Sequence, residues 1–98
     1  MREEDGTIEG DLRVTEDLEL NGTLTKTATV AAGATLYVNG TVGGDVVLER
    51  GSSVVVAGTV SGSVINRGGS LRVSGRVAGK IRRISGTTQL EPGAIVNG

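Results

Sequence analysis

Residues 40–57 read GTVGGDVVLERGSSVVVA, and residues 58–74 read GTVSGSVINRGGSLRVS. Both stretches begin with Gly-Thr-Val, and within each the apolar residues alternate with other residues, as in Val54, Val56, Val60 and Val64. Alternation with a period of two places one set of side chains on one face of a β-strand. Each stretch splits at small and glycine residues into three pieces, which predicts three short strands separated by turns.

The same start recurs along the chain. Gly22-Thr23-Leu24 and Gly6-Thr7-Ile8 precede residue 40, and Gly75-Arg76-Val77 follows residue 58. Self-similarity at a near-constant period is typical of repeat architectures, in which each unit packs only on its neighbours. The predicted coils are 6–21, 22–39, 40–57, 58–74 and 75–98. The sequence therefore predicts an all-β, single-stranded parallel β-helix (a solenoid) of triangular cross-section, with residues 1–5 as an acidic leader and 6–98 as the β-helix domain.

Aliphatic residues at equivalent positions of successive coils predict three core columns. The first is Ile8, Leu24, Val42, Val60 and Val77; the second is Leu12, Ala28, Val46, Val64 and Ile81; the third is Leu20, Val38, Val56, Val73 and, at its end, Leu90. The pattern breaks where Leu48 is followed one coil later by Asn66 and then by Arg83. We expect a bulge or an altered corner there, with Ile84 replacing Arg83 inside the core.

Composition agrees with a narrow core. The chain has seventeen glycines, one Tyr, and no Phe, Trp, Cys or His. Val, Ile and Thr favour strands because branching at Cβ suits a pleated surface. The lack of Cys fits a cytoplasmic location, and residues 1–5 lack the apolar run of a signal peptide.

The outward positions offer weaker signals. Thr7, Thr23, Thr41 and Thr59 form a predicted threonine column, which we interpret as strand-favouring rather than ice-binding because no second threonine column accompanies it. Val47 with Ile65, and Tyr37 with Val55, predict small apolar stripes that leave lateral contacts open.

Charge is segregated along the chain. Residues 1–49 hold three basic and ten acidic residues, and residues 50–98 hold seven basic and one acidic residue. Because position in the sequence of a solenoid maps onto position along its axis, the molecule is expected to be an axial dipole. Opposite ends would attract, although such charges also serve as ordinary solvated faces.

The ends of a solenoid carry unpaired backbone groups, which are templates for strand pairing. We therefore expect end-to-end self-association. The candidate residues are Glu9, Asp11, Glu16, Asp17 and Glu19 at one end, and Arg76, Lys80, Arg82, Arg83, Ile95 and Val96 at the other.

The stretches 40–46 (GTVGGDV) and 58–64 (GTVSGSV), with the closing 90–98 (LEPGAIVNG), resemble bactofilins over nearly the whole chain. This resemblance implies a right-handed, triangular β-helix that polymerises without nucleotide into bacterial cytoskeletal filaments and scaffolds other proteins, with only indirect membrane association. Members commonly carry a membrane-binding N-terminal segment, and a Phe where this chain has Ile95 or Val96. Family filaments join like end to like end, whereas the axial dipole favours head-to-tail joining.

Enzymatic chemistry finds little support. Solenoid acyltransferases and zinc hydratases use His, which this chain lacks, and a Ser without a His is weak evidence for a nucleophile. We expect no enzyme activity, no cofactor and no metal. The basic cluster from Arg67 to Arg83 lacks the interleaved aromatic residues of nucleic-acid binders. The alternative to self-assembly is a protein-binding module, such as an inhibitor or immunity protein.

Overall fold

The structure is a computed structural model that describes residues 2–96, which form strands and turns with no helix. The strands are β1 (Arg2–Glu4), β2 (Thr7–Ile8), β3 (Leu12–Val14), β4 (Leu18–Leu20), β5 (Thr23–Leu24), β6 (Ala28–Val30), β7 (Thr35–Val38), β8 (Thr41–Val42), β9 (Val46–Leu48), β10 (Ser53–Val56), β11 (Thr59–Val60), β12 (Val64–Val73), β13 (Arg76–Val77), β14 (Ile81–Leu90) and β15 (Ile95–Val96). Each pairs in parallel with the equivalent strand one coil away. The chain is therefore a parallel β-solenoid of about five coils, as predicted.

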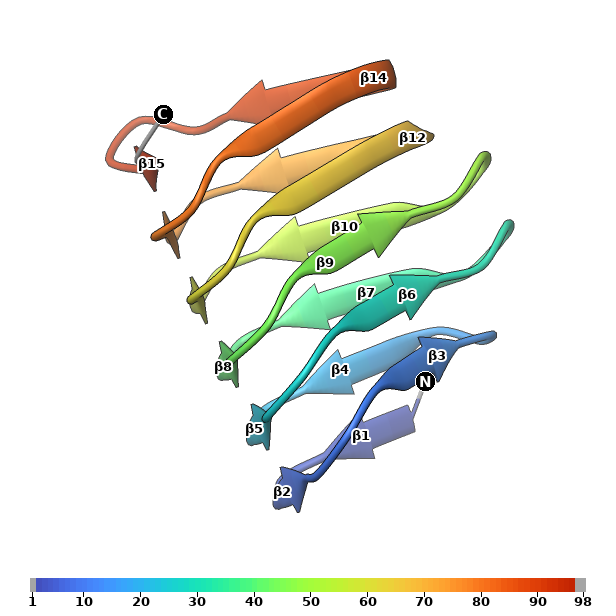
Figure 1. Ribbon diagram of the computed structural model, residues 1–98, viewed down its shortest axis with the longest axis vertical. Coiled ribbons are helices and arrows are strands. Elements are labelled where there is room, and N and C mark those ends of the chain that lie inside the picture. The colour runs from blue at the N-terminus through green and yellow to red at the C-terminus, as the bar shows by residue number, and fades with distance from the viewer. Residues whose placement is uncertain (1, 97–98) are drawn as a thin grey trace.

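The coils wind to the right (Figure 1). The chain runs from left to right along the near strands β3, β6 and β9, and from right to left along the far strands β4, β7 and β10, as it climbs toward the C-terminus. The short strands β2, β5, β8, β11, β13 and β15 form the third side. In this view the axis of the stack is close to vertical. The Cα positions span 28 × 25 × 20 Å.

The strand register confirms the three predicted core columns. Val42 pairs with Leu24 and Val60, Val46 pairs with Val64, and the column through Val56 reaches Leu90. The predicted core residues that are fully buried are Leu20, Leu24, Ala28, Val38, Val42, Val46, Val56, Val60, Val64, Val73 and Val77. Ile8 and Ile81 are half-buried, because each begins or ends its column and has a neighbouring coil on one side only.

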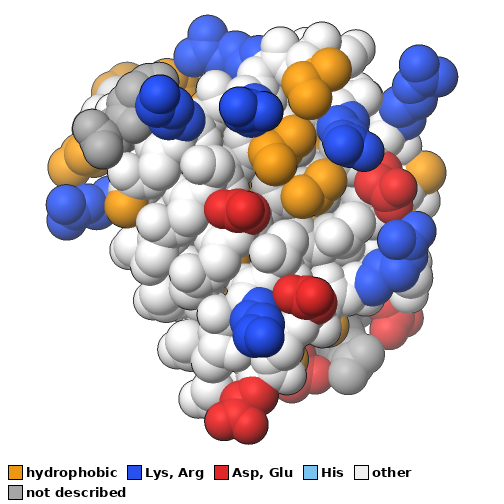
Figure 2. Space-filling view, viewed as in Figure 1, with side chains coloured by type: hydrophobic (Ala, Val, Ile, Leu, Met, Phe, Trp, Pro, Cys, Tyr) orange, Lys and Arg blue, Asp and Glu red, His pale blue; other side chains and the backbone are white. Residues whose placement is uncertain are grey.

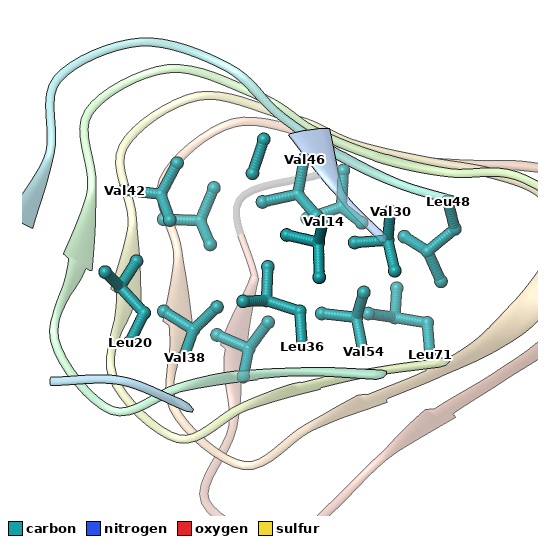
Figure 3. Packing of buried hydrophobic residues seen from close by; sticks show 14 of the residues in the cluster. Val14, Leu20, Val30, Leu36, Val38, Val42, Val46, Leu48, Val54 and Leu71 are labelled. Carbon is teal, nitrogen blue, oxygen red and sulfur yellow. The ribbon is translucent and has the colours of Figure 1, made fainter. Parts of the chain in front are cut away.

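The core is wider than the sequence predicted. Two further inward columns are present: Val14, Val30 and Leu48 on the near side, and Leu18, Leu36, Val54 and Leu71 on the far side. Figure 3 shows the two sets facing one another across the solenoid. Coils 6–21, 22–39 and 40–57 each supply one aliphatic side chain to each of the five columns, and no aromatic residue is needed to fill the interior.

The expected bulge is present, but its core assignment was wrong. Asn66 pairs with Arg83, and Arg67 pairs with Ser85, so Ile84 is the extra residue. Ile84 is 64% exposed, and Arg83 is exposed as well. Neither side chain enters the core, because β14 is the last strand of its column and has no further coil above it within residues 2–96.

The glycine that begins each coil after the first is required by close stacking. A Cβ on Gly58 would lie 2.0 Å from the carbonyl oxygen of Gly40, and a Cβ on Gly40 would lie 1.9 Å from that of Gly22. Beside this corner, one carbonyl accepts two bonds from the next coil: the amides of Ala57 and Gly58 both donate to Val38 at 2.8 and 2.7 Å. Glycine is therefore needed here for close approach of the backbones rather than for positive φ.

The predicted acidic leader contributes to the stack. Residues 2–4 form β1, which pairs with β4 so that Glu3 matches Glu19 and Glu4 matches Leu20. Asp5 continues this contact, since its Oδ1 accepts a hydrogen bond of 3.0 Å from Asn21 Nδ2. Residues 2–5 are therefore part of the solenoid, while Met1, Asn97 and Gly98 lie outside the described residues.

Candidate self-association surfaces at the two ends of the solenoid

Both ends of the stack present edge strands. At the N-terminal end β1, β2 and β3 each pair with one strand, and at the C-terminal end β14 and β15 each pair with one strand. No other strand within residues 2–96 pairs with their outer sides. A parallel edge of this kind presents a row of backbone donors and acceptors that can accept another strand.

The C-terminal end is the more apolar of the two. The inward columns finish there at Ile81, Arg83, Thr88, Leu90 and Val96, which have no coil above them in the described chain. Leu90 lies directly above the fully buried Val73 but is 45% exposed. Among residues 2–96, the strongly exposed large hydrophobic residues are Ile84, Leu90 and Ile95, and all three lie in this last coil. Exposed aliphatic side chains beside an unpaired strand edge are typical of an association surface.

The N-terminal end is more polar. Its inward columns begin at Glu4, Ile8, Leu12 and Val14. Val14 is buried and Ile8 and Leu12 are half-buried, while the half-buried Glu4 occupies the inward position beneath Leu20. Polar side chains also interact between coils on the outer surface near this end. Asn39 Nδ2 donates hydrogen bonds to Asn21 Oδ1 at 3.0 Å and to Glu19 Oε1 at 3.1 Å.

Charge separates along the axis as the sequence predicted (Figure 2). Acidic side chains gather toward the end that holds β1 and β2, and basic side chains toward β14. Residues 2–21 hold two basic and eight acidic residues, a formal charge of −6, and residues 75–96 hold four basic and one acidic residue, a formal charge of +3. The single acid of that last coil, Glu91, forms an ion pair with Arg72.

The cations of the last coil lie on more than one side of the solenoid. In the outward threonine column Arg76 stands above Thr59 and beneath Ile95, and Arg82 stands above Ile65 on the near side. Lys80 lies one coil above Ser63, at the corner between these sides. Its backbone amide donates a hydrogen bond of 3.1 Å to Ser63 Oγ. Within residues 2–96, neither these three side chains nor Arg83 has an acidic partner within 4 Å. We call Arg76, Lys80, Arg82 and Arg83 the basic collar.

The predicted residues fall at the predicted ends. Glu9, Asp11, Glu16 and Asp17 are exposed in the first coil, and Glu19 is half-buried beside Asn39. Asp11 also has a backbone role, since its Oδ1 accepts a 3.2 Å hydrogen bond from the amide of Thr27. Ile95 is exposed, and Val96 is half-buried against the core. The sequence reasoning missed Leu90 and Ile84 as surface residues. For Leu90 the signal was available, because the last member of any inward column has no coil above it.

The sides of the stack are less distinctive. Val47 lies beneath Ile65, and Tyr37 lies beneath Val55, as predicted, and all four side chains are half-buried. On the near side, Arg13 Nη2 lies 3.0 Å from Glu49 Oε1, across two coils. Within residues 2–96 no group of three or more Asp, Glu, His or Cys side chains is placed to hold a metal ion. In the same range, no helix is long and apolar enough to cross a membrane.

Comparisons of the chain with protein-family models, with curated proteins and with solved structures found no match. The resemblance to bactofilins therefore rests on the repeated motifs of the sequence and stays a prediction.

Proposed function

We propose that this protein is a structural, self-assembling protein whose copies join end to end into polymers, without nucleotide and without enzymatic activity. Its main partner is then a second copy of itself, and other proteins are clients held by the polymer. The repeat motifs shared with bactofilins support the same role and suggest a cytoplasmic scaffold in a bacterium.

One observation carries this proposal. The strongly exposed large hydrophobic residues of residues 2–96 are confined to the last coil, where β14 presents ten residues of edge strand. A copy placed on this edge would cover Leu90 and Ile95 and would satisfy the outer backbone groups of β14 and β15. Burial of apolar area contributes about 25 cal/mol per Å², and an added strand contributes backbone hydrogen bonds without a sequence requirement.

The test compares two substitutions of equal charge in adjacent residues. Leu90→Glu places a carboxylate on the inward column of the end surface, whereas Gln89→Glu places it on the outward face of the same strand, above Arg72. Sedimentation velocity over a range of protein concentrations should show polymers for the wild type and for Gln89→Glu. Leu90→Glu should sediment as a monomer with an unchanged β-sheet circular dichroism spectrum.

Two results would overturn the proposal. The first is a wild-type protein that sediments as a monomer at every concentration. The second is equal association of the Leu90→Glu and Gln89→Glu variants, which would remove the end surface from the joint. Either result would favour a module that binds a different protein, the role expected of a capped solenoid with an exposed lateral stripe.

A further inference from the structure

We infer that the joint between copies is polar: the C-terminal end of one copy docks on the N-terminal end of the next. This inference rests on the proposed self-association and adds its orientation and the groups that set it. It follows from the sign of the charge at each end of the stack and from where the last-coil cations lie around the solenoid.

Three joints are geometrically available to a solenoid with two open ends. An N-to-N joint would bring together two first coils of formal charge −6, and a C-to-C joint would bring together two last coils of formal charge +3. Only the C-to-N joint brings opposite charges together. The Coulomb energy between the two facing ends is attractive for the C-to-N joint and repulsive for the other two joints. Electrostatic attraction also raises the rate at which two copies meet.

The arrangement of the charges reinforces this orientation. The basic collar begins on the short side at Arg76, passes the corner at Lys80 and continues on the near side at Arg82. The first coil is likewise acidic on more than one side, with Glu3 on the far side in register with Glu19, and with Glu9 and Asp11 between β2 and β3. Opposed rings of charge attract in many rotations about the axis. Charge therefore selects which ends meet, and contacts such as those of Leu90 must select the rotation.

The sign of the salt dependence tests the orientation. Attraction between opposite charges is screened by salt, and so is repulsion between like charges. A polar joint therefore predicts that polymers of the wild-type protein shorten as sodium chloride rises from low to high concentration. Either like-end joint predicts that they lengthen under the same change, because salt then relieves repulsion.

A charge-matched pair of variants supplies the second arm. Arg76→Glu/Arg82→Glu reverses two collar cations, and Arg50→Glu/Arg67→Glu reverses two cations at a corner of the middle coils; all four side chains are exposed. Both variants change the net charge equally. At low salt we expect the collar variant to raise the concentration needed for assembly by about tenfold or more, which corresponds to roughly 1.4 kcal/mol per joint. The middle-coil variant should assemble like the wild type.

The outcomes separate the two proposals. Assembly that strengthens with salt and is indifferent to the collar variant would overturn the polar joint while leaving end-to-end assembly in place. Equal losses in the two variants would overturn it as well, since net charge rather than the collar would then control association. A wild-type protein that is monomeric at every concentration and salt would overturn both proposals together.

Discussion

Asn66 lies directly above Leu48 in the same inward column, although one side chain is an amide and the other is aliphatic. Both are fully buried. Asn66 Oδ1 accepts hydrogen bonds from the amides of Gly68 and Gly69 at 3.1 and 2.9 Å, and its Nδ2 donates to the carbonyl of Thr87 at 2.9 Å. The Asn66 side chain thus pairs with two backbone amides at the corner where β12 turns, and it links this corner to the last coil through the carbonyl of Thr87. A buried amide with all its polar atoms paired stabilises one local conformation.

Replacing this amide should be costly. Asn66→Leu keeps the side-chain size but leaves the buried amide of Gly69 and the half-buried amide of Gly68 without an acceptor. A buried unpaired amide costs about 1–3 kcal/mol. Urea unfolding followed by circular dichroism should show a loss of about 2–4 kcal/mol. The neighbouring exposed change Arg67→Ala should fall within about 0.5 kcal/mol of the wild type. A tolerated Asn66→Leu would mean that water reaches these amides.

The glycine column gives a position-dependent prediction with an internal control. In Gly58→Ala the new Cβ would lie 2.0 Å from the carbonyl oxygen of Gly40, so the coils must separate. We expect a loss of about 2–3 kcal/mol, or failure to fold. Gly6→Ala is the matched change in the first coil, where an added Cβ would have no atom within 4 Å and φ is not positive. Its stability should be unchanged or slightly higher. Equal melting temperatures for the two variants would disprove the close-stacking explanation.

The inward position at the end of β11 and the residue that follows the strand should differ sharply. Val60 is fully buried, and Ser61, the next residue, is exposed. Val60→Asp would place an unpaired carboxylate in an apolar column, which costs several kcal/mol, so the variant should be unfolded or insoluble. Ser61→Asp should fold normally. The measurement is far-ultraviolet circular dichroism of both purified variants. A soluble and stable Val60→Asp protein would show that the register is wrong.

Much of this fold could be predicted because the sequence repeats once in each coil. Equivalent aliphatic residues such as Val42 and Val60 recur at near-constant spacing, and parallel coils pair equivalent residues, so the sequence period also gives the register. The columns through Leu36 and Leu48 were harder to predict. Corners interrupt the alternation between successive strands, and a glycine or serine at a corner does not show on which side the next residue points.

The end surfaces could be predicted only in part. In a solenoid, position in the sequence gives position along the axis, so the acidic and basic ends could be predicted from where the charged residues lie in the sequence. Exposure at the last coil depends on which strand has no neighbour above it. Ile84 shows this: an aliphatic residue beside an arginine suggested the core, yet the bulge left it on the surface. The same reason explains why Leu90 was assigned to a column rather than to a surface.

The central claim is that copies join along the solenoid axis, and diffraction from oriented filaments tests it most directly. Stacked coils repeat about every 4.8 Å along the axis, so end-to-end polymers should give a reflection at about that spacing parallel to the filament. Electron micrographs of the same sample should show filaments about one solenoid wide, in keeping with Cα extents of 28 × 25 × 20 Å. A reflection of that spacing perpendicular to the filament would mean lateral association through the sides, and would contradict the account.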